Sequence, residues 1–303
     1  MTQLDRVALE RVIAVINGKG GVLKTFLTAN LSGFFAANGY RVLVVDLDQQ
    51  GSLARDYGVR DDDDYDHGKA LAAALMVQAA LTNARKSVRE NIDLIPGGRH
   101  LSGVSGYLMT KTPEQAILSL AQALEPFAGE YDVVLLDGPP GDQAIQNAAL
   151  GAARWAIIPT KSDATSLDGL EQVNDRFEQV LPYNASIDLL GVVLTDVDSS
   201  AKAIKRKAIR QIHDMFGSDE PLFKSVIRHA SAVVQTARDV GKLVLELERD
   251  ANDGPQWWEI RRGEASSDTY IPSSVTGLAG DIHSLASEIV ERLAAGESEE
   301  DGS

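Results

Sequence analysis

Seven short runs of apolar residues recur along the chain and constrain its fold more than any other feature. They lie at Val12–Ile16, Val42–Val45, Ile92–Ile95, Val133–Leu136, Ala156–Ile158, Leu189–Leu194 and Leu222–Ile227. Segments with helical periodicity separate most of them, including Leu27–Ala37, Pro113–Leu124 and Leu167–Val180. Strands that are apolar on both faces and alternate with helices predict a doubly wound α/β domain, with a mostly parallel sheet flanked by helices. Such domains bind ligands at the carboxyl ends of their strands.

The chain contains no internal repeat and no Pro/Gly-rich linker, so one domain is expected over about residues 9–295. The acidic residues 296–303 are expected to form a disordered tail. Residues 246–275 interrupt the alternation before a last helix, Leu278–Leu293. Trp257 and Trp258 in this stretch either pin an inserted loop onto the core or form a docking surface for a partner.

Composition excludes several classes of protein. The chain has no cysteine, which excludes disulfides, thiolate zinc sites and cysteine-ligated iron–sulfur clusters. Its five histidines lie far apart without paired ligand spacing, which disfavours a histidine metal site. No apolar run approaches the roughly 18 residues of a membrane span, and the N-terminus (MTQLDRVALERV) carries acids where a signal peptide carries cations, so a cytoplasmic protein is expected. The net charge is −15, with acid runs at Asp61–Asp64 and Glu297–Asp301 that are typical of solvated segments.

The stretch from Asn17 to Phe26 (NGKGGVLKTF) follows the first apolar run and precedes a helix, as a phosphate-binding loop must. Its glycines let the backbone turn tightly and aim N–H groups at an anion, and the helix N-terminus favours negative charge. Lys24 is expected to reach the β- and γ-phosphates, and Thr25 to offer its hydroxyl to Mg²⁺. Lys19 adds a cation that an ordinary phosphate loop lacks.

Acidic residues end two of the predicted strands. Asp46 and Asp48 follow Val42–Val45, and Asp137 follows Val133–Leu136. In a parallel sheet these strand ends lie beside the phosphate loop, where carboxylates can hold Mg²⁺ and its waters or orient an attacking water. Aspartates at strand ends also cap turns and helices, and that alternative stays open for each of them taken alone. Together with the loop, they favour a nucleotide site.

The segment from Lys19 to Thr25 (KGGVLKT) resembles the deviant Walker A motif of the ParA/MinD family of ATPases, whose signature is the early lysine. Further segments resemble the family's later motifs in the same order: Val42–Gly51 (VLVVDLDQQG), Asn91–Pro96 (NIDLIP), Asp132–Pro140 (DVVLLDGPP), Ile158–Leu170 (IPTKSDATSLDGL) and Gly191–Asp198 (GVVLTDVD). Gln49 stands where ParA proteins usually have proline. The resemblance covers about residues 11–245.

The resemblance implies a role for each matching residue. ATP would close a dimer in which Lys19 reaches the partner's nucleotide, Lys24 holds phosphate and Asp48 positions the attacking water. Thr25, Asp46 and Asp137 would surround the magnesium ion. Asp163, usually glutamate in ParA proteins, would lie near the nucleotide and the dimer interface. The implied nucleotide-contacting set is Gly18, Lys19, Gly20, Gly21, Val22, Leu23, Lys24, Thr25, Phe26 and Asp163.

Two residues depart from the family pattern. Leu23 replaces a glycine, which costs little if its backbone is helical and roughly 1–2 kcal/mol if its φ is positive; a helical backbone is expected. Phe26 replaces a hydroxyl residue that would contact the α-phosphate, which weakens binding by about 0.5–1.5 kcal/mol. Because Lys24, Asp48 and Asp137 are intact, a working site that takes ATP and Mg²⁺ is predicted.

Three kinds of family member are compared. A nitrogenase-reductase-like electron carrier needs cluster cysteines, which are missing. A MinD-like membrane ATPase needs a basic amphipathic C-terminal helix, whereas this chain ends in ERLAAGESEEDGS, so no membrane partner is expected. Only about ten residues precede the first strand, too few for the N-terminal helix-turn-helix domain of some plasmid ParA proteins.

A ParA-like ATPase needs a basic surface for nonspecific DNA, and Ala201–Arg210 (AKAIKRKAIR) provides a candidate. The expected DNA-binding residues are Lys202, Lys205, Arg206, Lys207, Arg210 and, farther along, Arg228, with Lys224, Arg238 and Lys242 nearby. A solvated helix face is the alternative. The prediction is a cytoplasmic, nucleoid-associated ATPase, weakly active alone, that dimerises on ATP and partitions a plasmid, phage or chromosome with a ParB-like adaptor. The alternative is a positioning ATPase of the same family whose cargo is a protein complex.

Overall fold

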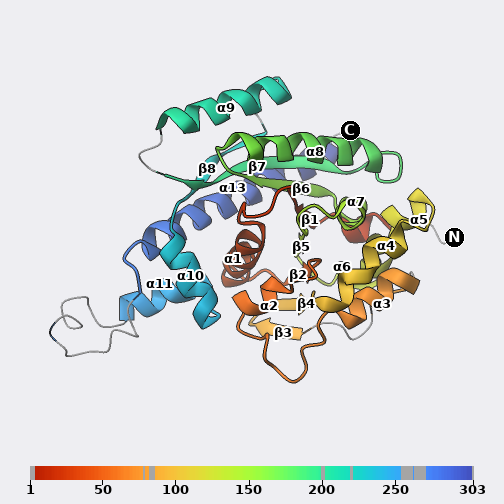
Figure 1. The fold of residues 1–303 in the computed structure, drawn as a ribbon, viewed down its shortest axis with the longest axis horizontal. Helices are drawn as coiled ribbons and strands as arrows, with labels where there is room; N and C mark the ends of the chain where they lie inside the picture. The colour runs from red at the N-terminus through yellow and green to blue at the C-terminus, as the bar shows by residue number, and fades with distance from the viewer. Residues whose placement is uncertain are drawn as a thin grey trace.

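The computed structural model describes residues 4–77, 79–81, 86–198, 202–218, 221–253, 262 and 271–301. Its centre is an eight-stranded sheet in the order β3-β4-β2-β5-β1-β6-β7-β8 (Figure 1). The strands are β1 (Val12–Val15), β2 (Val42–Asp46), β3 (Lys86–Arg89), β4 (Ile92–Ile95), β5 (Val133–Asp137), β6 (Trp155–Thr160), β7 (Asp188–Val197) and β8 (Leu222–Arg228). Every pairing is parallel except that of β3 with β4. The predicted fold class is confirmed.

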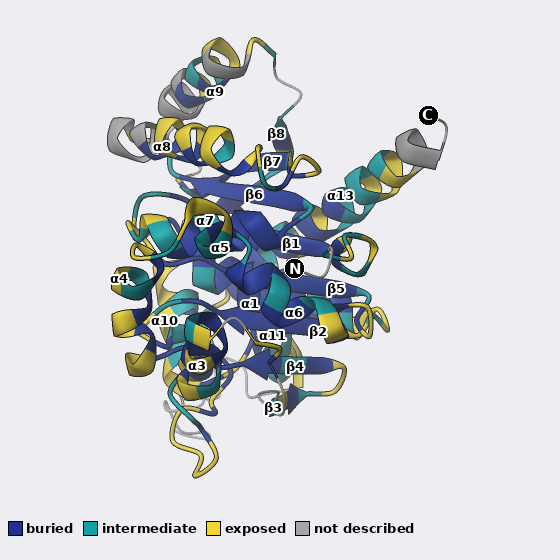
Figure 2. Cartoon of the chain, turned by 90° about the vertical axis from the view of Figure 1, so that its right-hand side faces the viewer, coloured by how far each residue is buried: buried dark blue, intermediate teal, exposed yellow. Residues whose placement is uncertain are grey.

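Alternate strand residues face opposite sides of the sheet, and each side is covered by its own set of helices (Figure 2). On one side, residues such as Val12 and Leu43 pack with α3 (Lys69–Val77), α4 (Val104–Leu108), α5 (Pro113–Ile117), α6 (Ser119–Ala128), α7 (Gln143–Ala152), α8 (Ala164–Val180) and α9 (Lys202–Phe216). On the other side, residues such as Ile13 and Val44 pack with α1 (Lys24–Ala37), α2 (Ser52–Asp56), α10 (Ser231–Val240), α11 (Val244–Asp253) and α13 (Val275–Asp301). Two short 3₁₀ turns, η1 (Val7–Leu9) and η2 (Arg99–Gly103), complete the set.

All seven predicted strands are present, but strand β3 was missed. Its sequence, KSVR, buries only Val88 and carries no apolar run, so its single antiparallel pairing at the sheet edge left no signal. The helix predicted over Pro113–Leu124 is two helices that meet at Leu118. Thr112 begins the first of them with a capping box, in which its side chain accepts from the Gln115 N–H.

The C-terminal end differs from the expected disordered tail. Helix α13 continues through Asp301, and Gly296 lies against the Trp155 ring, where a Cβ atom would not fit. Glu297 pairs with Arg11 at 3.7 Å. The acid-rich composition did not indicate a helix, although glutamate favours helix. In the interrupted stretch, α11 covers residues up to Asp253, whereas Trp257 and Trp258 lie outside the described residues.

Candidate nucleotide-binding site

The predicted phosphate loop joins β1 to α1 at the middle of the sheet, between the carboxyl ends of β5 and β6. Three buried polar residues that the sequence reasoning passed over brace it. Asn17 donates to Pro159 O (2.8 Å) and accepts from the Lys19 N–H (2.8 Å). Gln146 donates to Asn17 O (3.4 Å) and to Pro139 O in the turn after β5 (2.8 Å), and Thr195 donates to Val22 O (3.2 Å). The loop is therefore held from three sides. These contacts join residues that are far apart in the chain, so only the folded structure could reveal them.

Lys24 is 6% exposed and folds back into its own loop. Its Nζ donates to Lys19 O (2.7 Å) and Asn17 O (3.2 Å). Burial lowers the pKa of this amine, and the charges of Asp137 and Asp48 oppose that shift. When a nucleotide binds, phosphate oxygens are expected to replace these two carbonyl oxygens as the hydrogen-bond partners of Lys24. The side chain is thus already inside the cradle that it would use.

Leu23 is in the left-handed region, with φ 65° and ψ 23°, so the expected helical backbone is wrong. Gly21 also has positive φ (76°), and the two residues together turn the chain into α1. The conformation costs a leucine roughly 1–2 kcal/mol. Leu23 is half-buried against the core beneath α1, and this packing offsets part of the strain.

Phe26 is 3% exposed and lies in the core on the α1 side of the sheet, together with Ile13 and Leu27. Its ring is therefore a packing element. Only its backbone N–H, in the first turn of α1, remains for a nucleotide.

Asp46 and Asp137 are paired neighbours at the ends of β2 and β5, and both are fully buried. Asp46 accepts from the N–H groups of Asp48 (3.0 Å) and Leu53 (3.1 Å). Burial, together with the nearby Asp137 charge, raises its pKa well above the usual range. Asp46 thus organises the segment that follows β2.

Asp137 has one carboxylate oxygen, Oδ2, with no hydrogen-bond partner. Burial raises the pKa of this carboxyl to about 7, against the lowering effects of a hydrogen bond from Thr25 and the Lys24 charge. A buried, unpaired carboxylate oxygen beside a threonine hydroxyl fits Mg²⁺, which prefers oxygen ligands and shares them with phosphates and water. Within the described residues no group of three or more acidic or histidine side chains could hold a metal alone. Magnesium here would need the nucleotide as a ligand.

Asp48 is half-buried, in the turn between β2 and α2. Its Oδ1 accepts from the Gln50 N–H (2.9 Å), and its carbonyl accepts from the N–H groups of Gly51 (3.1 Å) and Gly98 (3.0 Å). These hydrogen bonds fix the turn that carries Asp48 at the end of β2.

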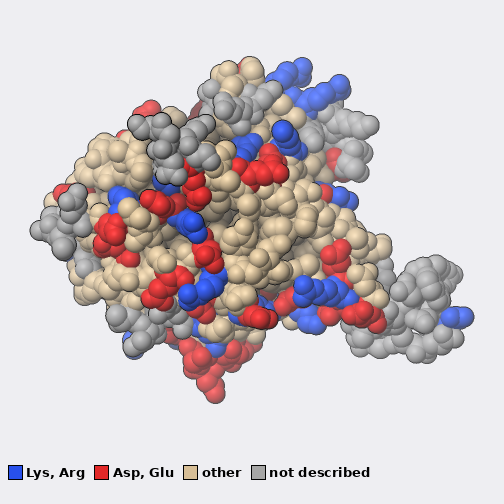
Figure 3. Space-filling view, turned by 180° about the vertical axis from the view of Figure 1, so that it is seen from behind, with Lys and Arg blue, Asp and Glu red and all other residues tan. Residues whose placement is uncertain are grey.

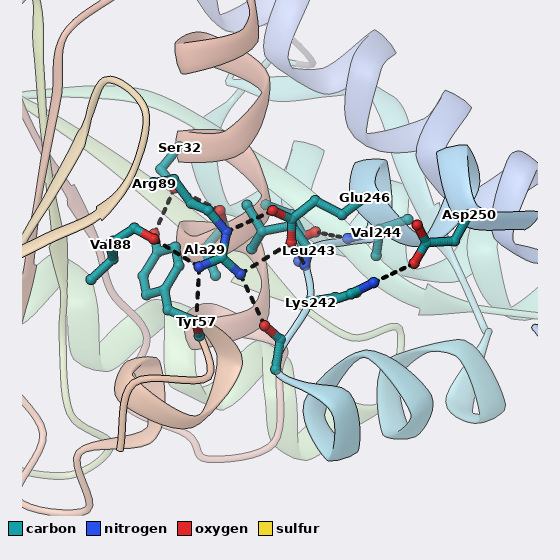
Figure 4. Close-up of polar contacts among 12 residues, drawn as sticks. Ala29, Ser32, Tyr57, Val88, Arg89, Lys242, Leu243, Val244, Glu246 and Asp250 are labelled. Atoms are coloured by element: carbon teal, nitrogen blue, oxygen red, sulfur yellow. Dashed lines mark hydrogen bonds and ion pairs between the residues drawn. The ribbon is translucent and has the colours of Figure 1, made fainter. Parts of the chain in front are cut away.

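The far end of α2 is clamped to the turn between α10 and α11 (Figure 4). Arg89 forms two hydrogen bonds to Glu246 (2.6 and 3.2 Å) and donates to the carbonyls of Tyr57 (3.1 Å) and Gly241 (3.0 Å). Arg238 pairs with Asp56 at 2.9 Å. Because these groups are half-buried or buried, α2 gives the Asp46–Gly51 segment a rigid support.

Lys19 and Asp163 form an ion pair at 2.9 Å across the ends of β1 and β6. Their side chains remain 36% and 46% exposed. The structure thus brings together two residues that the sequence resemblance assigned to the nucleotide and the dimer interface, on a surface that a second protomer could reach.

The predicted DNA-binding residues divide into two groups. Arg206 and Arg210 are exposed on α9, which packs through the buried Ala208 and Ile212. The side chains of Lys202, Lys205 and Lys207 lie outside the described part of the structure. Seen from behind, Lys and Arg gather near α9, at the end of the molecule opposite the acidic loop of Asp61–Asp64 (Figure 3).

The cations farther along are mostly engaged within the protein. Arg228 makes two hydrogen bonds to Asp281 (2.6 and 2.7 Å), and Lys242 pairs with Asp250 (2.6 Å). Asp281 lies on α13, 53 residues after Arg228, so the sequence alone did not indicate that pairing. The basic surface centres on α9.

The chain is similar to several known proteins. A family model described as an AAA domain matches residues 10–189. The chromosome partitioning protein ParA of Caulobacter vibrioides is 32% identical over 78% of this chain and 86% of its own. The sporulation initiation inhibitor protein Soj of Bacillus subtilis is 29% identical over 72% and 83%. A structure of cobyrinic acid a,c-diamide synthase from Mycobacterium smegmatis with bound ADP and magnesium has a TM-score of 0.64 and 25% identity, covering 86% of this chain and 99% of its own.

The fold and site define a P-loop nucleotide-binding protein. The chain belongs to the ParA/MinD family of P-loop ATPases. No helix within the described ranges is long and apolar enough to cross a membrane.

Proposed function

We propose that this chain is a Mg²⁺-dependent ATPase that dimerises on ATP, binds DNA without sequence preference and partitions a replicon together with a ParB-like adaptor. The observation that supports it most is the position of Lys24, which lies inside an intact phosphate loop beside the unpaired Asp137 oxygen. The ParA relatives support partitioning as the role.

The residues of the site divide the work of hydrolysis. Lys24 exchanges its two carbonyl partners for phosphate oxygens, and the N–H groups of the loop and of α1 bind the remaining charge. Asp48 orients a water toward the γ-phosphate from the free side of its carboxylate. Thr25 and Asp137 would hold Mg²⁺, which neutralises phosphate charge when bound.

Lys19 contributes to the dimer. In the single chain it pairs with the exposed Asp163 at 2.9 Å. Exposed pairs of this kind are worth about 0–1 kcal/mol, so a partner's triphosphate can replace Asp163 with little loss. The exchange would couple closure of the dimer to ATP.

DNA binding is assigned to α9. A net charge of −15 repels DNA at long range, but the acids of Asp61–Asp64 lie at the opposite end of the molecule from α9 (Figure 3). Salt screens charges that are more than about 8–10 Å from the DNA, so the cations of α9 act on the phosphates more strongly than distant acids do. Two α9 helices in a two-fold dimer double the number of phosphate contacts, which makes binding dependent on ATP and sensitive to salt.

The test is a gel-shift series with random and defined duplexes at rising salt, with ATP, with ADP and without nucleotide. Arg206→Ala combined with Arg210→Ala should weaken binding at least tenfold, whereas Arg249→Ala on α11 should not. A dimer formed with ATP that never binds DNA at low salt would favour the alternative, a positioning ATPase with a protein cargo. Lys24→Ala should abolish ATP binding by calorimetry; ATP binding as in wild type would refute the nucleotide site itself.

A further inference from the structure

Two cavities that share part of their lining lie at the turn that carries Asp48. The smaller, about 170 Å³, lies between the Asp48–Gln50 turn and the Pro139–Pro140 turn after β5. The larger, about 430 Å³, is lined by Gln49, Gln50, Arg60, His67, Arg99 and Ser102, among others. Gln49, Gln50 and Ser102 line both cavities, and the two together are called the passage below.

The larger cavity is lined by positive charge. Arg60 and Arg99 are exposed on its rim and form no ion pair with any described residue. The nearby acids are otherwise engaged: Asp62 and Asp64 pair with Lys86, and Asp66 accepts from the N–H groups of Gly68 (2.8 Å) and Ala70 (2.9 Å). The remaining lining is amide, hydroxyl and imidazole. Arg60 and Arg99 thus present two guanidinium groups without an ion pair among the described residues, which suits an anion. Besides Asp48, the smaller cavity is lined by one further carboxylate, Asp142, which accepts from the Ile145 N–H (3.1 Å).

The floor of this cavity is preformed. His67 has positive φ (57°), a strained conformation for a histidine. Its ring stacks edge-on against Tyr65 at 4.5 Å, and Tyr65 in turn donates to Gly97 O (2.9 Å). Gly98, with φ 136°, lies so close to the His67 backbone that no side chain would fit. Gln49, where ParA proteins usually have proline, adds an amide to the passage.

We infer that this passage binds inorganic phosphate, as the exit pocket for the product of hydrolysis; the product role rests on the proposed ATPase function. Water attacks the γ-phosphorus, the bond to the bridging oxygen breaks, and ADP leaves with that electron pair. The water's proton leaves to solvent, and phosphate remains beside Asp48. Arg60 and Arg99 draw the dianion outward, away from the carboxylates of Asp46, Asp48 and Asp137.

The first test measures phosphate binding to the nucleotide-free, full-length protein by calorimetry at constant ionic strength, with chloride as the reference anion. Arg60→Gln and Arg99→Gln should each weaken phosphate binding by about tenfold, and the double variant should abolish it. Arg249→Gln, an exposed arginine on α11 without an ion pair among the described residues, is the matched control and should bind as wild type. The side-chain resonances of His67 should shift on titration with phosphate.

The second test separates product from free phosphate by comparing the rates of ATP cleavage and phosphate release. Release should lag behind cleavage in the wild type, and the lag should lengthen in the double variant, because the two arginines that draw phosphate away from the carboxylates are gone. The pocket would be overturned if the double variant bound phosphate as tightly as the wild type. It would also be overturned if the His67 resonances did not shift with phosphate, or if Arg249→Gln weakened phosphate binding as much as the substitutions at Arg60 and Arg99. Phosphate binding is measured without nucleotide, so a wild-type protein that does not bind phosphate would overturn the pocket but not the ATP site. A wild-type protein that does not bind ATP would refute the proposed function but not phosphate binding by the pocket.

Discussion

The ends of β2 and β5 carry aspartates in register with one another, yet the two strand ends differ in what they leave available. At the end of β2, both oxygens of Asp46 accept backbone N–H groups. At the end of β5, Asp137 keeps one oxygen unpaired in the interior. The two carboxylates are equally buried, but backbone N–H groups occupy both oxygens of Asp46, whereas Asp137 keeps one oxygen that could bind a ligand. The difference comes from the turn after each strand, because only the β2 turn folds back to donate N–H groups.

The largest effect is expected at the β5 end. Asp137→Asn should lower ATP turnover by about 10²–10³-fold, because an amide cannot neutralise Mg²⁺. Circular dichroism should show that the fold is retained. Turnover within threefold of wild type would show that Asp137 has no role in the reaction, and the proposed difference between Asp137 and Asp46 would then be wrong.

At the β2 end, activity should depend on Asp48 instead. Asp48→Ala should cut hydrolysis by about 10²-fold while ATP affinity stays within threefold, because a water-orienting group affects rate more than binding. Light scattering should show a persistent ATP dimer. Should turnover survive, another group must orient the water.

The raised pKa of Asp137, about 7, predicts how stability depends on pH. Between pH 4 and 7 the folded state holds a proton that the unfolded state has lost, so stability falls as pH rises. The nucleotide-free protein should be less stable at pH 8 than at pH 5, by about 1–3 kcal/mol. Urea titrations at both pH values check this, and Asp137→Asn should reduce the difference. An unchanged slope in the variant would contradict the assignment.

Asp46→Asn should affect stability more than chemistry. One of its two N–H donors would meet an amide NH₂ group, which costs about 1–3 kcal/mol for a buried unsatisfied group. Denaturant unfolding measures the loss, and Asp63→Asn, in the exposed Asp61–Asp64 run, is the control. A larger loss of turnover here than in Asp137→Asn would reverse the roles of the two strand ends.

The smallest effect concerns the loop that both strand ends face. In a helix interior, alanine is more favourable than glycine by about 1 kcal/mol. Since Leu23 has φ 65°, Leu23→Gly should instead be more stable than Leu23→Ala by about 1 kcal/mol. Thermal unfolding shows which of the two variants is more stable. If Leu23→Ala is the more stable one, the backbone at residue 23 is not left-handed.

Much of the fold could be predicted because its signals are local. Buried parallel strands require apolar residues on both faces, so β1, β2 and β5 are visible as runs. Strand β3 escaped because an edge strand needs only one buried side chain, Val88. The helical end of α13 escaped because acidic composition says little about backbone conformation.

For the site, the sequence by itself determined the loop with Lys24 and Thr25 and the carboxylates that follow two strands. These are contiguous motifs whose spacing is fixed by chain geometry. The tertiary structure alone decided that Leu23 is left-handed, that Phe26 faces the core, and that Arg228 is bound by Asp281. It also decided which carboxylate keeps a free oxygen. Each of these depends on groups far apart in sequence, since hydrogen-bond partners and packing neighbours are chosen only when the chain folds.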